Sequence, residues 1–291
     1  MPLASARRGS ETSPSMNRIE ERFARLRREG RKGFIVYIGA GDPDLAATQA
    51  LAAAFDRIGV DILELGVPFS DPLADGVVNQ LAAQRGLESG TTPARVLETV
   101  AAIRRDCQLP IVLYLYYNLI HRRGLERFVR EAAAAGVDGV LALDLPPEEI
   151  GEYRQHMAAA GLCPIVLVAP TTPESRIGVI VREGRGFVYY VSREGVTGMQ
   201  ATVAANLAEM TGRIRRQTDL PIAVGFGIST PEQARLAAGC ADAVVVGSAV
   251  VDRIARCGRS PDLVPQVTAF TQTLVAAVQQ AGGSASDTPR S

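Results

Sequence analysis

Three carboxyl groups lie close together near residue 70. Glu64 sits inside the apolar segment 62–66, and Asp71 and Asp75 follow it in the Pro-containing segment 67–76. A carboxyl group inside an apolar strand loses hydration, which raises its pKa toward the range of a general acid or base. Position alone leaves two interpretations of Glu64 open: a functional acid, or a structural carboxylate satisfied by backbone groups or a buried arginine. Asp and Pro are common in turns without function, but acids in unlike surroundings at one strand end can divide acid and base roles.

Glycines indicate a second kind of site. Apolar runs near the end of the chain lead into Gly198, Gly225, Gly227 and Gly247, and Ser248 follows the last of these. Glycine lets backbone N–H groups approach a ligand closely, and a helix that begins at Ser248 would attract an anion. Strand-to-helix turns use glycine in any case, yet three successive loops share the pattern. Because these loops hold no basic cluster, the sequence predicts a phosphate site built from backbone amides.

Short apolar runs alternate with amphipathic segments and predict the elements that position these groups. Runs rich in Val, Ile, Leu or Tyr, with little polar alternation, are typical of strands buried on both faces of a parallel sheet. Eight such strands alternating with at least eight helices over about 250 residues favour a closed (β/α)8 TIM barrel over an open doubly wound sheet. The runs are FIVYIG from Phe34, ILELG from Ile62, PIVLYLY from Pro110, GVLALD from Gly139, PIVLVA from Pro164, FVYYV from Phe187, PIAVG from Pro221 and AVVVG from Ala243.

The ends of the helices are also marked. A hydroxyl residue followed by Pro predicts a helix start, because the hydroxyl caps an unpaired N–H and Pro has none to leave unpaired. This dipeptide occurs at Thr92, Thr172, Thr230 and Ser260. An extra helix over residues 17–29 should cover the bottom of the barrel. We expect one barrel domain over residues 17–281, between mobile tails at 1–16 and 282–291.

Composition excludes several classes of function. Lys plus Arg and Asp plus Glu both number 31, so the net charge is zero and nothing draws the chain to nucleic acid or anionic lipid. No apolar run reaches the roughly 18 to 20 residues of a membrane span, and the first residues lack a secretory apolar region. Four widely spaced cysteines without a CxxC motif predict free thiols in a reducing cytoplasm. Two histidines leave little for a metal site.

In this order, these residues resemble the alpha subunit family of tryptophan synthase, from about residue 17 to residue 280. The most specific element is LELGVPFSDPLADG at 63–76. Support comes from AGDP at 40–43, YYN at 116–118, DLP at 144–146, and the segments SREGVTG, GFGIS and GSA.

The resemblance implies a carbon–carbon lyase of tryptophan biosynthesis. The family cleaves indole-3-glycerol phosphate reversibly, by a retro-aldol reaction, to indole and glyceraldehyde 3-phosphate, without a metal or organic cofactor. Glu64 matches the catalytic acid and base that protonates indole C3 and takes the glycerol hydroxyl proton. Asp75 matches the carboxylate that interacts with the indole N–H as positive charge develops.

The resemblance also implies binding residues and a partner. Gly198, Gly227, Gly247 and Ser248 match the phosphate cradle. Phe226 and Tyr189 match the indole pocket and substrate wall, and Thr197 matches the mobile loop that closes beside Asp75. The family's partner is the tryptophan synthase beta subunit in an α2β2 complex, and the region that meets it corresponds to Pro68, Asp71, Pro72 and Asn118.

Several positions depart from the family pattern. Gly39 stands where Thr is usual, Val77, Val78 and Asn79 replace a stretch with Pro and an apolar residue, and Leu119 replaces Pro. Tyr114 and Leu115 stand where Met and Thr are more frequent. Two interpretations follow: ordinary drift with repacking, or a paralogue that cleaves a related glycerol phosphate adduct or releases free indole without a beta partner. A further alternative is a subunit that mainly activates a beta-type partner, against which the presence of both Glu64 and Asp75 argues.

Overall fold

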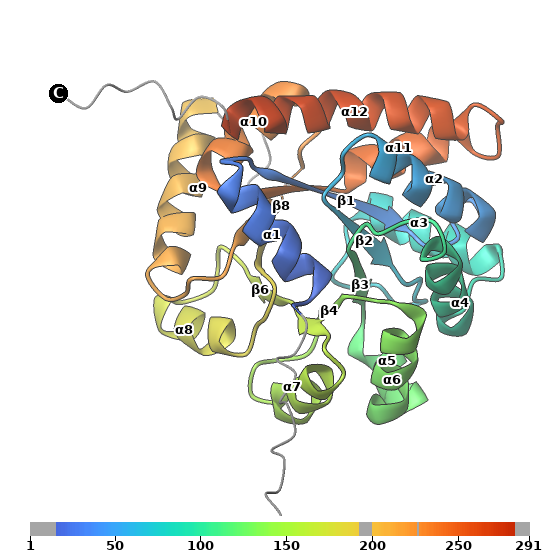
Figure 1. Ribbon diagram of the computed structural model, residues 1–291, viewed down its shortest axis with the longest axis horizontal. Helices are drawn as coiled ribbons and strands as arrows, with labels where there is room; N and C mark the ends of the chain where they lie inside the picture. Colours follow the sequence, from blue (N-terminus) through green and yellow to red (C-terminus); the bar gives the residue numbers. More distant parts are fainter. Residues whose placement is uncertain (1–15, 192–199, 226, 283–291) are drawn as a thin grey trace, which may run out of the picture.

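The structure is a computed structural model and describes residues 16–191, 200–225 and 227–282. The predicted site residues Thr197, Gly198 and Phe226 lie outside the described residues, as do residues 1–15 and 283–291 of the two predicted tails. Parallel strands form one sheet in the order β5-β4-β3-β2-β1-β9-β8-β7-β6, and helices surround it (Figure 1). The predicted TIM barrel is confirmed.

The strands coincide with the predicted apolar runs. They are β1 (Gly33–Gly39), β2 (Ile62–Gly66), β3 (Ile111–Leu115), β4 (Gly139–Ala142), β5 (Cys163–Pro164), β6 (Val166–Val168), β7 (Val188–Val191), β8 (Ile222–Gly225) and β9 (Ala243–Val246).

The helices lie between the strands and at both ends of the barrel domain. They are α1 (Arg18–Arg28), α2 (Leu45–Arg57), α3 (Val77–Glu88), α4 (Pro93–Ile103), α5 (Tyr117–Arg123), α6 (Leu125–Ala135), α7 (Ile150–Ala159), α8 (Glu174–Arg182), α9 (Gln200–Arg215), α10 (Pro231–Cys240), α11 (Ser248–Cys257) and α12 (Leu263–Gly282).

The barrel closes through the segment that was expected to be one strand from Pro164. This segment is divided into β5, which pairs with β4, and β6, which pairs with β7. Ile165 lies between them and its N–H donates to the Val140 carbonyl over 2.9 Å. The part of the chain that the structure describes therefore has nine short strands where eight were predicted, because one segment changes its pairing partner halfway along.

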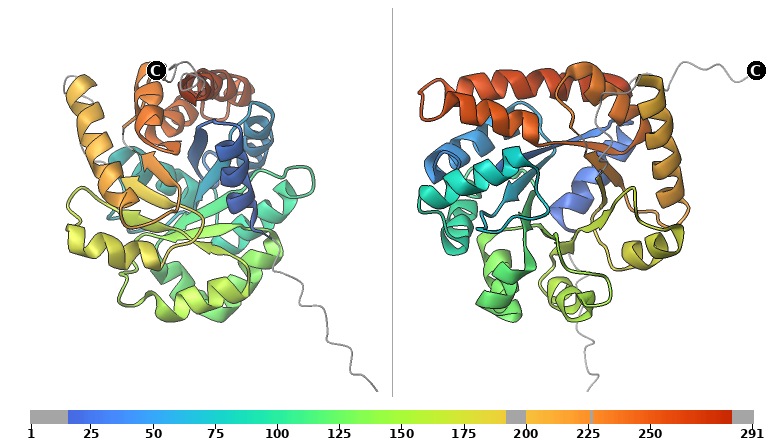
Figure 2. Two further views of the ribbon diagram at one scale, coloured as in Figure 1. Left: turned by 60° about the vertical axis from the view of Figure 1, so that its left-hand side comes forward. Right: turned by 180° about the vertical axis from the view of Figure 1, so that it is seen from behind.

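Helix α1 covers the N-terminal ends of the strands, as expected. It crosses in front of the strands in Figure 1 and behind them in the rear view of Figure 2. Its cap residue Asn17 donates to the carbonyls of Asp138 (2.9 Å) and Gly161 (2.8 Å), and Glu20 accepts two 2.7 Å hydrogen bonds from Arg185. Buried Ile19, Phe23 and Leu26 pack against the bottom of the barrel lumen.

The predicted helix starts are correct in two of the four cases. Thr92 caps α4, and Thr230 forms a capping box with Gln233 at the start of α10. The Thr172 hydroxyl instead accepts from the Ala169 N–H, and α8 begins at Glu174 without a side-chain cap. Likewise, α12 begins at Leu263, two residues after the Pro that follows Ser260.

Candidate active site

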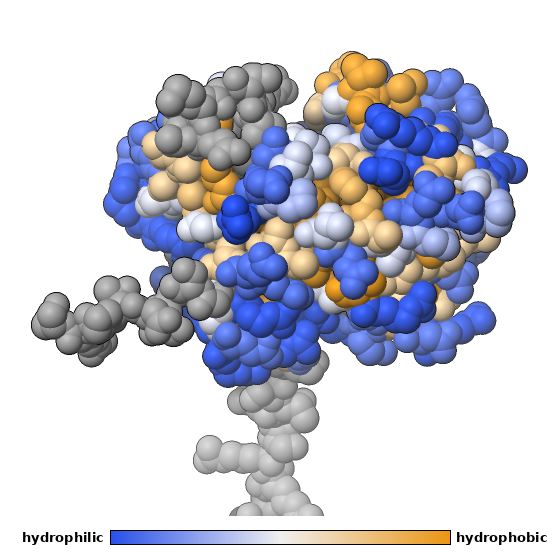
Figure 3. All heavy atoms as spheres, turned by 90° about the horizontal axis from the view of Figure 1, so that it is seen from above, coloured by the Kyte–Doolittle hydropathy of each residue, from blue (hydrophilic) through white to orange (hydrophobic). Residues whose placement is uncertain are grey.

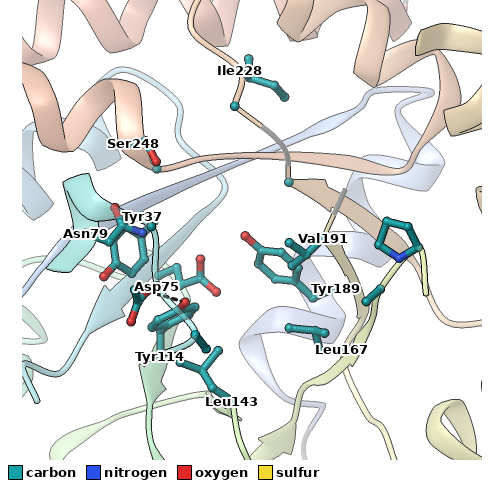
Figure 4. A pocket seen from close by; sticks show the side chains of 18 of the residues that line it. Tyr37, Asp75, Asn79, Tyr114, Leu143, Leu167, Tyr189, Val191, Ile228 and Ser248 are labelled. Carbon is teal, nitrogen blue, oxygen red and sulfur yellow. Dashed lines mark hydrogen bonds between the residues drawn. The ribbon is translucent and has the colours of Figure 1, made fainter. Parts of the chain in front are cut away.

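A cavity of about 480 Å³ opens at the C-terminal ends of the strands, opposite α1. This is the volume of a small-molecule site. Side chains from β1, β2, β3 and β7 reach it from below, while the loop after β2 and the start of α11 border it (Figure 4). Its lining includes predicted site residues from distant parts of the sequence: Glu64, Asp75, Tyr189, Gly227, Gly247 and Ser248.

Glu64 occupies the centre of the barrel. Its neighbours Leu63 and Leu65 point outward into the core beneath the helices, so the alternation of the strand turns Glu64 into the lumen. The side chain is 1% exposed, and neither carboxylate oxygen has a hydrogen-bond partner within the described residues. Burial, and secondly the charge of Asp75, raises the pKa of Glu64 to about 8. The carboxyl group is therefore mostly protonated at neutral pH.

Two glycines leave room for tyrosine rings in the lumen. A Cβ atom at Gly225 would stand only 2.6 Å from the Tyr189 hydroxyl oxygen, and one at Gly66 would overlap the Tyr37 hydroxyl. Larger residues at these strand ends would displace the rings. The strands can therefore place two tyrosines in the layer around Glu64 because they carry glycine where those rings approach.

Asp75 lies in the loop after β2 and is held by two residues of β3 and its end. Tyr114 donates its hydroxyl to Oδ1 and Tyr116 donates to Oδ2, both over 2.8 Å, and the first of these bonds is drawn in Figure 4. The Tyr116 oxygen also accepts from the Ala74 N–H over 2.9 Å. These bonds draw the loop, and with it the carboxylate, to the mouth of the barrel.

The start of α11 offers N–H groups to the cavity. Gly247 is the N-cap of α11 and Ser248 is its first residue. The first N–H groups of a helix have no intrahelical partner, and the helix dipole favours negative charge there. No Lys or Arg is among the described residues that line this cavity. Among the described residues, backbone N–H groups at the start of α11 and the Ser248 hydroxyl are the groups available to an anion at this end.

An apolar wall completes the cavity, with one polar exception. Leu143, Leu167, Val191 and Ile228 provide hydrophobic surface (Figure 4). Asn79, in the first turn of α3, has a buried side-chain oxygen that finds no hydrogen-bond partner among the described residues. A donor on a bound molecule could satisfy it.

Among the positions that depart from the family pattern, Tyr114 and Asn79 line the cavity. Leu115 instead lies in the core beneath the helices, and Gly39 packs closely against α3. Sequence reasoning missed Tyr37 and Tyr116 as site residues. Their signal was weak, since tyrosines in apolar strands are usually part of the core. In the structure Tyr37 of β1 is the register partner of Glu64 of β2.

Not every predicted acid reaches the cavity. Asp71 is exposed on the loop and does not line it. The same loop and the start of α3 carry exposed apolar side chains, at Leu73 (82% exposed), Val77 (70%) and Leu81 (48%). Figure 3 shows that hydrophobic residues gather in surface patches between hydrophilic ones.

The described residues contain no group of three or more His, Cys, Asp or Glu side chains that could hold a metal ion. None of their helices combines the length and apolar character needed to span a bilayer.

The model of the family described as tryptophan synthase alpha chain matches residues 23–279. A curated protein of that name from Opitutus terrae is 51% identical over 91% of this chain and 100% of its own length. One from Geobacter sulfurreducens is 49% identical over 90% and 99%.

Solved structures agree with these relatives. A tryptophan synthase subunit alpha from Legionella pneumophila is 34% identical with a TM-score of 0.85, covering 91% of this chain and all of that one. A chain from the tryptophan synthase a2b2 complex of Pyrococcus furiosus is 37% identical with a TM-score of 0.79, covering 84% of this chain and 99% of that one. The sequence match and the barrel geometry lead to one conclusion: this chain belongs to the tryptophan synthase alpha chain family.

Proposed function

We propose that this chain, a lyase of the tryptophan synthase alpha family, cleaves indole-3-glycerol phosphate to indole and glyceraldehyde 3-phosphate with Glu64 and Asp75 as its two catalytic carboxyl groups. The observation that carries the proposal is the contrast between them. Glu64 is buried without a partner and has a pKa of about 8, whereas both oxygens of Asp75 accept hydrogen bonds. Unlike environments of this kind let neighbouring carboxyl groups take different roles, here proton transfer by Glu64 and stabilisation of positive charge by Asp75.

The reaction follows from these two states. Protonated Glu64 transfers its proton to indole C3, and the positive charge that develops on the ring nitrogen is stabilised by the Asp75 carboxylate. The Glu64 carboxylate then takes the proton of the glycerol hydroxyl next to the ring as the carbon–carbon bond breaks. The bonding electrons return to the indole ring, an aldehyde forms, and Glu64 is protonated again. A positioned general acid contributes about 10²- to 10⁴-fold to the rate.

The phosphate is expected at the start of α11. Gly247, Ser248 and Gly227 line the cavity, and the N-terminus of α11 favours an anion. Gly198, Thr197 and Phe226 stay predictions from the sequence for the cradle, the closing loop and the indole pocket. Tyr189, with the apolar wall, supplies a surface for the aromatic ring.

A second candidate substrate is a glycerol phosphate adduct whose ring carries a hydrogen-bond donor in addition to the indole N–H. The specific observation in its favour is Asn79, whose buried oxygen has no partner within the described residues. A site that leaves such a group unpaired discriminates against a ligand that cannot satisfy it. Comparison of kcat/KM for indole-3-glycerol phosphate and its hydroxyindole analogues separates the two candidates.

A beta subunit is the proposed partner. The exposed apolar side chain of Leu73 lies on the loop that the family resemblance assigns to that contact, and those of Val77 and Leu81 follow it at the start of α3. The Pyrococcus furiosus relative comes from an a2b2 complex, and we infer the same α2β2 assembly here. We also infer a cytoplasmic location, because a phosphorylated substrate does not cross membranes unaided.

The test is an assay of the purified chain with indole-3-glycerol phosphate, with and without a beta subunit, following release of glyceraldehyde 3-phosphate. We expect turnover by the wild type and loss of at least about 10²-fold in kcat in Glu64→Gln. Affinity for a glycerol phosphate ligand should change less than about tenfold, since that ligand does not need the acid. The matched control is Glu126→Gln, whose side chain is 77% exposed. A fully active Glu64→Gln variant would refute the assigned role.

A further inference from the structure

Tyr114 makes a contact whose function the reaction scheme leaves unexplained. It lies on β3 opposite Gly66 of β2, and its hydroxyl donates to Oδ1 of Asp75 over 2.8 Å. A tyrosine hydroxyl has one proton to donate, so this donor is committed to Asp75. Tyr116, two residues further along, donates to the other oxygen. Both oxygens of the Asp75 carboxylate are therefore bound by tyrosines at the C-terminal end of β3.

Of the two tyrosines that donate to Asp75, Tyr114 is the more rigidly placed. Its ring meets the buried Tyr37 ring edge to face, with centroids 5.0 Å apart. Both residues stand on barrel strands, whereas Asp75 belongs to the loop after β2. Burial, followed by the charge of Asp75, raises the pKa of Tyr114 far above its ordinary value. The hydroxyl therefore keeps its proton at neutral pH and donates it to Asp75.

The position of the Asp75 carboxylate matters because the proposed reaction needs negative charge beside the ring nitrogen of the substrate. The ring nitrogen becomes positive only after C3 is protonated, so Asp75 must already stand beside it when that happens. Each carboxylate oxygen has lone pairs left after accepting one hydrogen bond. A displacement of about 1 Å in such a group can cost about 10²-fold in rate.

We propose that Tyr114 is a positioning residue whose hydroxyl holds Asp75 in place to accept the indole N–H of the substrate. The inference rests on the proposed function, since it assumes that Asp75 meets the ring nitrogen. It adds that a residue at a position where the family more often has Met has become part of the catalytic arrangement. Tyr114 acts through Asp75 and needs no contact of its own with the reacting atoms.

The test is Tyr114→Phe, which removes the hydroxyl and keeps the ring. With indole-3-glycerol phosphate, we expect kcat to fall at least about tenfold and KM to change less than about threefold. In an Asp75→Asn background the same substitution should change kcat less than about threefold, because the group through which it acts is gone. With the N-methylindole analogue, which has no N–H to present, Tyr114→Phe should also lose less than about threefold.

Equal losses in the wild-type and Asp75→Asn backgrounds, or equal losses with both substrates, would overturn the proposal, as would an unchanged kcat in Tyr114→Phe. The matched control is Tyr153→Phe, which removes a buried hydroxyl that donates to the Val140 carbonyl and does not line the cavity. It should keep wild-type kinetics. Tyr116→Phe is a poorer probe, because it also removes the acceptor for Ala74 N–H. Wild-type turnover of indole-3-glycerol phosphate tests the proposed function separately: if the wild type is inactive, that function fails before Tyr114 is questioned.

Discussion

Replacing Glu64 by Gln should stabilise the protein while it removes activity. The carboxyl group is 1% exposed, has no hydrogen-bond partner within the described residues, and has a pKa raised from 4.5 to about 8 by burial and by Asp75. In the unfolded chain the same group ionises near its ordinary pKa. Folding at neutral pH must therefore return a proton to Glu64, which costs free energy. Glutamine has nearly the same shape and has no charge to neutralise.

The size of this effect follows from the pKa difference. Each pKa unit corresponds to about 1.4 kcal/mol, so the rise from 4.5 to about 8 amounts to about 5 kcal/mol above pH 8. Because the folded-state pKa is raised, the destabilisation is absent below about pH 4.5 and grows as the pH rises toward about 8. At about pH 7 it reaches about 3 kcal/mol.

Urea unfolding of wild type and Glu64→Gln at several pH values measures this term directly. The difference between the two free energies of unfolding cancels every other titrating group that the proteins share. We expect the variant's advantage to grow by about 3 kcal/mol between about pH 5 and about pH 8. Glu126→Gln, at an exposed position, should show no comparable trend. If the difference between Glu64→Gln and wild type does not vary with pH, Glu64 is not a buried acid held protonated by its surroundings.

Three other outcomes are expected. The value of kcat/KM should fall above about pH 8, because the protonated form of Glu64 starts the reaction and is lost as the pH rises through its pKa of about 8. A pH–rate profile that stays level to about pH 9.5 would contradict this prediction. Gly247→Val should raise KM at least about tenfold, because an added Cβ atom would stand 3.3 Å from the Tyr37 ring and the further methyl groups would crowd the start of α11. Steady-state kinetics and product inhibition by glyceraldehyde 3-phosphate measure this effect, and unchanged constants would put the phosphate elsewhere. Leu73→Asp should weaken association with a beta subunit by about tenfold or more in calorimetry, because it places a charge on an apolar contact surface. The control is Val179→Asp on α8, and equal weakening by both variants would show that the loop is not the contact.

Much of the fold could be predicted because strands covered on both faces must be apolar throughout. Each predicted run coincides with a strand, from β1 to β9, and only the run at Pro164 is divided. The division could not be foreseen, because it reflects a change of pairing partner between β4 and β7 rather than a change in composition. Thr172 failed as a helix cap for a similar reason: its hydroxyl is used by the Ala169 N–H in a turn.

The candidate site could be located but not assembled from the sequence. The alternation of β2 gives Glu64 one of two faces, and only the closed barrel decides which face is the lumen. The two hydrogen bonds from Tyr114 and Tyr116 to Asp75 join residues about forty positions apart. No local pattern records such a contact. The partner of a loop carboxylate is determined by where the loop ends up, which depends on the packing of the whole mouth of the barrel.

The way α1 is anchored has a consequence for synthesis on the ribosome. This helix is translated first, yet Asn17 bonds Gly161, 144 residues later, and Glu20 pairs with Arg185, 165 residues later. Much of the surface that its apolar face packs against, including Cys163 and Phe187, is made only after more than half of the chain has emerged. During that interval Ile19, Phe23 and Leu26 stay open to chaperones or to other nascent chains, so the first helix to be made is among the last to dock.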